Sequence, residues 1–184
     1  ILLFTATSLA SIVKANLTGS FARIEQDGAL MIGIASAAIT LALVFYTIGV
    51  FAERRSGTLT ASHLIFFYLG LACDTAGTAV MSVIAQGESA SPAHAATGLL
   101  AIILMIVHAA WATVVLVRKN HEAMARFHRF SIAVWTIWLI PYICGMLMGI
   151  PAIYLSANAA FGAALNGAGA IGLVFYLRGD ARRA

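Results

Sequence analysis

The chain of 184 residues is 61% hydrophobic and only 10% charged, whereas about a quarter of the residues in a soluble domain are charged. This composition excludes a water-soluble fold, because so few charged side chains cannot cover its surface. The formal net charge of +4 does not indicate nucleic acid as a partner, since the basic residues are divided among short stretches between apolar segments. We expect an all-α fold, a polytopic transmembrane bundle of about five helices in contact with membrane lipid.

The region 1–28 precedes the first long apolar segment, and we expect it to form a partial or interfacial helix. Its apolar beginning, residues 1–13, is too short to cross a bilayer. Three origins remain open for it: the end of a truncated helix, an interfacial helix or the remnant of a signal peptide.

Five apolar segments have the length of a membrane span. They are residues 29–52, 63–85, 95–117, 131–150 and 152–177. The second contains Asp74 and the fourth contains Pro141, which a bundle tolerates when neighbouring helices satisfy the polar groups. The fifth is rich in glycine and alanine, which favours close packing within the bundle and, as an alternative, an interface with another protein. Cys73 and Cys144 lie within apolar segments, so we expect buried thiols.

The basic residues predict the orientation of the chain in the membrane. Most of the 11 Lys and Arg residues lie in the stretches 54–55, 118–129 and 178–183, while 86–94 and 150–151 contain none. Because loops on the cytoplasmic side retain positive charge, the three basic stretches are expected to face the cytoplasm.

Ionisable residues inside a span are costly, which makes Asp74 and His108 the strongest candidates for function. Counted from the cytoplasmic ends of their spans, both lie about 15 Å deep, so we expect them to meet near the middle of the bilayer. There Asp74 would accept a hydrogen bond from His108 and orient the imidazole toward a metal. A proton relay and simple packing between helices are the alternatives.

Four histidines are predicted to lie on inward faces: His63, His94, His108 and His128. His94 and His108 are fourteen residues apart, the spacing by which one helix can offer ligands to two stacked haems. His63 and His128 each begin a span on the cytoplasmic side, so they form a second possible pair of iron ligands. Contact with lipid headgroups is the alternative for this pair.

Other residues complete the predicted haem b site. Arg55, Arg126 and Arg129 lie near the level of His63 and could bind the haem propionates. Small residues between His94 and His108 would leave room for the flat macrocycle. We expect packing or interfacial roles for five aromatic residues within the spans, namely Tyr46, Tyr68, Trp111, Trp138 and Tyr154, and a solvated surface position for His121. No phosphate-binding or hydrolytic motif is evident, so no catalytic residue is predicted.

About residues 39–148 resemble the HsmA family, small bacterial membrane proteins associated with haem binding and protection from haem toxicity. The resemblance is carried by the motifs HL, DTxGT, HxxTG, HAxWA and FHxFS, which begin at or contain His63, Asp74, His94, His108 and His128. It implies a multi-pass protein of the bacterial inner membrane that binds haem b through these histidines. Haem sequestration or electron transfer would be its function.

Two other functions remain open. The chain could be an accessory transmembrane subunit that packs against a larger respiratory or photosynthetic complex, or it could form a homo-oligomer through its glycine-rich fifth span. It could also be a small proton-coupled transporter that uses Asp74 and His108, although the sequence shows no inverted repeat.

Overall fold

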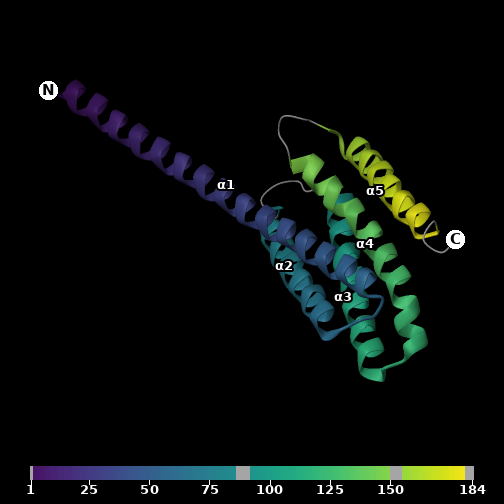
Figure 1. The fold of residues 1–184 in the computed structure, drawn as a ribbon. Coiled ribbons are helices and arrows are strands. Elements are labelled where there is room, and N and C mark those ends of the chain that lie inside the picture. The colour runs from purple at the N-terminus through teal and green to yellow at the C-terminus, as the bar shows by residue number, and fades with distance from the viewer. Residues whose placement is uncertain (1, 86–91, 150–154, 181–184) are drawn as a thin grey trace.

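The computed structural model describes the backbone of residues 2–85, 92–149 and 155–180 (Figure 1). All regular elements in these ranges are α-helices, which confirms the predicted all-α class. They are α1 (Leu2–Ser56), α2 (Ala61–Ala85), α3 (Pro92–Arg118), α4 (His121–Gly149) and α5 (Ala157–Asp180). Each contains a stretch long and apolar enough to cross a membrane: Gln26–Ser56, Ala61–Ile84, Gly98–Arg118, His121–Met148 and Ala157–Phe175.

Two helices begin at positions that differ from the predicted spans, because side chains cap them elsewhere. The α4 helix starts ten residues before the predicted span 131–150, where Asn120 Oδ1 accepts a hydrogen bond of 3.0 Å from the backbone N–H of Ala123. The α5 helix starts five residues after the beginning of the predicted span 152–177, where Ser156 Oγ accepts one of 3.3 Å from Ala159. Residues 150–154 lie outside the described chain.

The α1 helix is a single element of 55 residues, which corresponds to a length of about 80 Å. This is far longer than the roughly 30 Å apolar core of a bilayer, and Figure 1 shows the N-terminal part of α1 extending away from the other helices. Region 1–28, predicted as a partial or interfacial helix, is continuous with the first span from Leu2 onward. Polar residues in this region end an apolar segment, but without a proline they do not end a helix.

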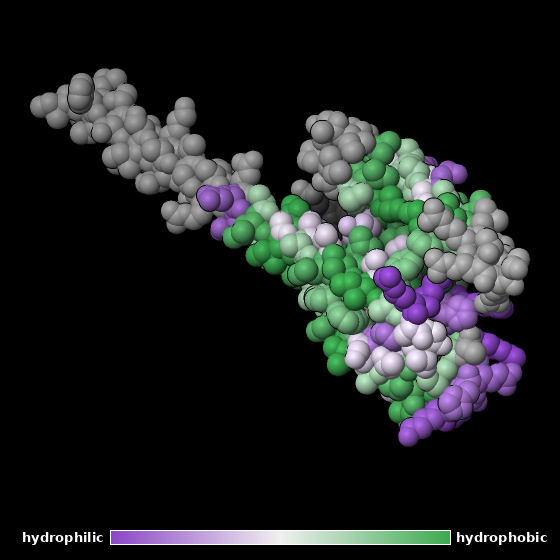
Figure 2. All heavy atoms as spheres, viewed as in Figure 1, coloured by the Kyte–Doolittle hydropathy of each residue, from purple (hydrophilic) through white to green (hydrophobic). Residues whose placement is uncertain are grey.

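Helices α1 to α4 form a closed four-helix arrangement, in which α1 contacts α2 and α4, and α3 contacts α2 and α4. The α5 helix lies outside and packs mainly on α4 (Figure 1). Consecutive helices run in opposite directions, so the α1–α2 and α3–α4 connections share one end of the bundle. Figure 2 shows hydrophilic side chains gathered at this end, which contains the basic stretches 54–55 and 118–129.

The α1–α2 interface is built by placing aromatic rings against glycines of the opposite helix. A Cβ atom added at Gly49 would lie 2.6 Å from the ring of Phe67, and one at Gly70 would lie 2.6 Å from the ring of Tyr46. Both rings are fully buried. The same antiparallel register continues at Gly77, where the backbone of α1 approaches most closely. These contacts fix the depth at which each polar residue of α1 and α2 lies.

Candidate functional site

Polar side chains are buried on the inward faces of all four helices of the bundle. They are Glu53 of α1, His63 and Asp74 of α2, His108 of α3 and Ser131 of α4. Away from water, each is costly unless it finds a hydrogen-bond partner. Their surroundings therefore indicate what the interior of this protein can do.

His108 lies in a box of aromatic rings and is only 1% exposed. The centroids of Phe67, Phe127 and Phe130 lie 4.5, 5.5 and 5.8 Å from the centroid of its imidazole. Its Nε2 atom forms a hydrogen bond of 3.0 Å with Ser131 Oγ, while Nδ1 has no hydrogen-bond partner among the described residues. His108 is thus held in place through one ring nitrogen, and the other is left available.

Asp74 has a different set of neighbours. Its Oδ2 atom accepts a hydrogen bond of 3.0 Å from the indole N–H of Trp138, and the Trp138 ring packs edge-on against Tyr46 with centroids 5.1 Å apart. Trp138 and Tyr46, which the sequence suggested only as packing or interfacial residues, thus line the surroundings of Asp74. Trp138 lies two helical turns beyond Ser131 on the same face of α4. This spacing is the signal in the sequence that could have identified Trp138 as an inward-facing residue.

Asp74 and His108 do not form the predicted hydrogen bond, because each has another partner. Phe67 contacts His108, and Asp74 lies seven residues further along α2, so the two groups differ in depth by about 10 Å. The prediction assumed that α2 and α3 end at the same depth. In the structure α3 extends about one turn further at the end where α2 begins, which shifts His108 away from Asp74.

His63 caps the start of α2. Its Nδ1 atom accepts a hydrogen bond of 3.2 Å from the backbone N–H of Thr60 and also lies 3.2 Å from Thr60 Oγ1. This resembles a capping box, in which the third residue of a helix bonds back to the residue before its first turn. Because Nδ1 acts as an acceptor, the neutral ring carries its proton on Nε2. In this arrangement His63 has no free lone pair for a metal.

The remaining predicted ligands add no metal site among the described residues. The side chain of His94 lies outside the described part of the structure. His128 is half-buried and is engaged in an interaction of its own. Cys73 and Cys144 are free thiols, the first half-buried and the second buried. Among the described residues, no group of three or more His, Cys, Asp or Glu side chains could hold a metal ion.

The arginines predicted to bind propionates lie on the surface. Arg126 forms an ion pair of 2.6 Å with Glu122 one turn earlier on α4, and both side chains are about three-quarters exposed, at 77% and 74%. Arg129 and Arg55 are also exposed. Arg126 borders a groove on the outside of the bundle.

Around His108 itself the interior is filled by aromatic rings, whereas at Gly98, one of the small residues between His94 and His108, an added Cβ would meet only Thr78, at 3.9 Å. The rings of Tyr46 and Phe67 occupy the positions opposite Gly70 and Gly49, and Ala101 is buried among its neighbours. Phe127 and Phe130 cover the imidazole from the side of α4. Rings therefore cover His108 on the described sides, and the predicted haem between His94 and His108 stays a prediction, because the side chain of His94 lies outside the described residues.

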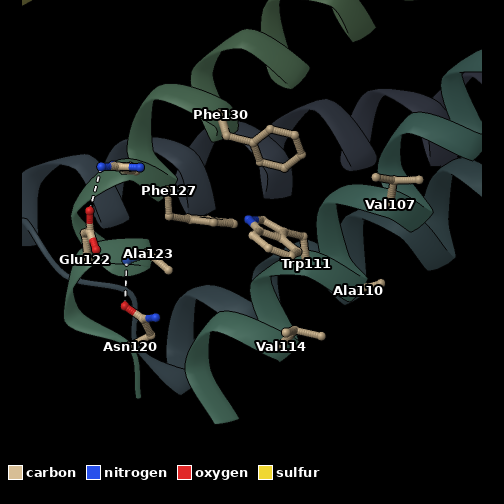
Figure 3. Close-up of a pocket in the computed structure, with 10 residues that line it drawn as sticks. Val107, Ala110, Trp111, Val114, Asn120, Glu122, Ala123, Phe127 and Phe130 are labelled. Carbon is tan, nitrogen blue, oxygen red and sulfur yellow. Dashed lines mark hydrogen bonds and ion pairs between the residues drawn. The ribbon is translucent and has the colours of Figure 1, made fainter. Parts of the chain in front are cut away.

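A groove of about 720 Å³ lies instead on the outside of the bundle, between α3 and α4. Figure 3 shows Trp111, Phe127 and Phe130 at this groove, with aliphatic side chains of α3 beside them. Its polar lining residues are gathered at the start of α4: Asn120, Glu122 and Arg126. Phe127 and Phe130 contact His108 as well, so they form the wall between the groove and the buried imidazole.

No family model, curated protein or solved structure matches this chain. The resemblance to the HsmA family therefore stays a prediction. The function must be argued from the residues of the chain itself.

Proposed function

We propose that this multi-pass membrane protein binds haem b in a bacterial inner membrane and so sequesters haem or passes electrons. The observation that supports the proposal best is His108, a buried imidazole within a membrane-spanning helix whose Nδ1 atom has no partner among the described residues. Ionisable groups at such depth mark functional sites more often than structural ones. The surrounding phenylalanine rings provide the dry, apolar environment typical of haem pockets.

These residues fit a haem with one protein ligand better than a haem held between two histidines. His108 would be the ligand, and Ser131 would orient the ring through its hydrogen bond to the other nitrogen. His63 is engaged at the start of α2 and lacks a free nitrogen in this arrangement. When bound, the haem iron would supply one-electron chemistry. The protein would contribute the imidazole of His108 as the ligand, exclude water from the haem and provide a cation for the propionates.

The test is an absorbance titration of the purified protein with haem in mild detergent. The wild type is expected to show a Soret band and, after reduction, an α-band. His108→Ala is expected to lose these bands, whereas His63→Ala is expected to retain them, because it removes another buried histidine that serves as a helix cap. Absence of both bands in the wild type would refute haem binding. An unaltered spectrum of His108→Ala would refute the ligand assignment alone.

The α5 helix supports a second function, that of an accessory subunit. One face of α5 packs on α4 through Ala160, Ala164 and Ala168, which are fully buried. On its remaining surface, an added Cβ at Gly162 or Gly169 would meet no atom within 4 Å. A further helix could approach closely there. A monomeric mass in mild detergent, measured on protein isolated from its native membrane, would exclude this function.

The transporter hypothesis loses its main argument, because Asp74 and His108 bind different partners at different depths.

A further inference from the structure

We infer that the groove between α3 and α4 is a binding site for a planar aromatic molecule that carries carboxylates at one edge, as haem and other porphyrins do. The inference rests on the proposed function and assigns it a place on the outside of the bundle. The sequence predicted a position between helices in the core for such a cofactor, and the groove is a different position.

The size and the lining of the groove match such a molecule. A volume of about 720 Å³ lies within the range of roughly 300 to 1,000 Å³ that small-molecule sites have. The rings of Trp111, Phe127 and Phe130 provide flat surfaces on which a macrocycle can stack (Figure 3). Because the polar lining residues lie only at the start of α4, an occupant would place its apolar part toward the membrane and its charged edge toward that end.

Arg126 is placed to bind the charged edge. It lines the groove, and its ion pair with Glu122 is highly exposed to solvent. Exposed pairs of this kind are weak, so the guanidinium can exchange a water-screened partner for a carboxylate at the mouth of an apolar groove. Arg118, Lys119 and Arg129 are exposed nearby in the chain and add positive potential at this end of the bundle.

The groove also has a direct relation to His108. Phe127 and Phe130 line the groove, and their ring centroids lie 5.5 and 5.8 Å from the imidazole of His108. Phe127 stacks nearly parallel to the imidazole, at an interplanar angle of 15°. Phe127 and Phe130 therefore separate an occupant of the groove from His108, and these two side chains would have to turn aside for the imidazole to bind an iron in the groove.

The decisive test fills the groove without touching His108. Ala110 is exposed on α3 and lines the groove, whereas Ala72 is an equally exposed alanine of α2 that does not. We expect Ala110→Trp to weaken the binding of haem and of iron-free protoporphyrin by about tenfold or more, because the indole occupies the space of the macrocycle. Ala72→Trp is expected to bind both molecules as the wild type does. Binding is measured by haem absorbance and by porphyrin fluorescence in mild detergent.

A second pair of variants tests the charged edge without risk to the packing. Arg126→Gln is expected to weaken binding of both molecules by about tenfold through the loss of a charge-assisted hydrogen bond. Arg129→Gln, on the same helix but outside the groove, is expected to weaken binding much less, because it removes only part of the general positive potential.

The outcomes separate this inference from the proposed function. If the wild type binds haem and Ala110→Trp binds it equally well, the groove is not the site, although haem binding stands. If iron-free porphyrin binds in a manner sensitive to Ala110→Trp but no haem spectrum develops, the groove site stands and the haem function fails. If neither molecule binds and mass spectrometry finds only phospholipid with the purified protein, the groove is a lipid site and the inference is overturned.

Discussion

At the scale of single residues, the membrane interior of this protein is organised by which polar groups find partners. Asp74 is satisfied by the indole of Trp138, and His108 by the hydroxyl of Ser131. One nitrogen of His108 and the hydroxyl of Tyr46 lack partners among the described residues. Polar groups without a partner are costly inside a membrane. We therefore take the unpartnered nitrogen of His108 as the centre of the proposed function.

Trp138 is predicted to contribute to stability through its indole N–H. Trp138→Phe keeps an aromatic ring against Tyr46 but removes the hydrogen bond to Asp74, leaving a buried carboxyl oxygen without a donor. We expect a loss of about 1–3 kcal/mol in the free energy of unfolding, measured by denaturation in mixed detergent micelles. Trp111→Phe, at an exposed indole, serves as the control and is expected to have little effect. Equal stabilities of the two variants would show that the Asp74 hydrogen bond contributes nothing.

At the scale of helices, close approach between α1 and α2 depends on glycines that receive rings from the opposite helix. This gives the glycines of α1 and α2 a structural role in the packed bundle. The capping of α2 by His63 belongs to the same scale, since a predicted metal ligand is used to begin a helix. On the outside of the bundle, α3 and α4 leave a groove between them.

Gly70→Ala is predicted to destabilise the bundle although alanine favours helices. The added methyl group would lie 2.6 Å from the Tyr46 ring, which is itself fully buried and cannot move aside without disturbing the core. We expect a loss of about 1–3 kcal/mol in the free energy of unfolding, typical of overpacking. Gly162→Ala, where nothing lies within 4 Å, should instead be neutral or stabilising by up to about 1 kcal/mol. If Gly70→Ala is as stable as Gly162→Ala, the α1–α2 register described here is incorrect.

At the scale of the whole molecule, the protein is a bundle of α1 to α4 with α5 attached to α4 and a long N-terminal extension of α1 (Figure 1). The basic stretches 54–55 and 118–129 lie at the end where α3 passes into α4. The polar mouth of the groove lies at this same end. With the orientation that the basic stretches predict, the proposed ligand would be reached from the cytoplasmic side of the membrane.

The orientation is testable by labelling of introduced cysteines. Arg129→Cys and Gln26→Cys place exposed thiols at opposite ends of the bundle. A membrane-impermeant maleimide is expected to label Arg129→Cys in inverted membrane vesicles and Gln26→Cys in intact spheroplasts, because positively charged loops stay in the cytoplasm. The background is measured on the unmodified chain, whose own thiols are Cys73 and Cys144. The reverse pattern would place the mouth of the groove on the opposite side.

Much of the architecture could be predicted from the sequence. Five helices long and apolar enough to cross a membrane follow from the length and hydropathy of individual segments, which are local properties of the chain. The buried state of Asp74 and His108 followed as well, because their positions within apolar segments leave them no access to water. The continuation of α1 to Leu2 was missed, since hydropathy reports the boundary of a membrane span and not the end of a helix.

Only the tertiary structure decided which polar groups meet. The partner of a side chain in a bundle depends on the offset between helices along their axes, and a shift of one turn, about 5.4 Å, exchanges every contact. That offset separates His108 from Asp74 and gives each another partner, Ser131 and Trp138. No pattern within one helix encodes it, because it results from how rings and glycines of different helices pack together. The sequence by itself determined that this is a helical membrane protein with buried ionisable groups, while packing determined the place left for a ligand.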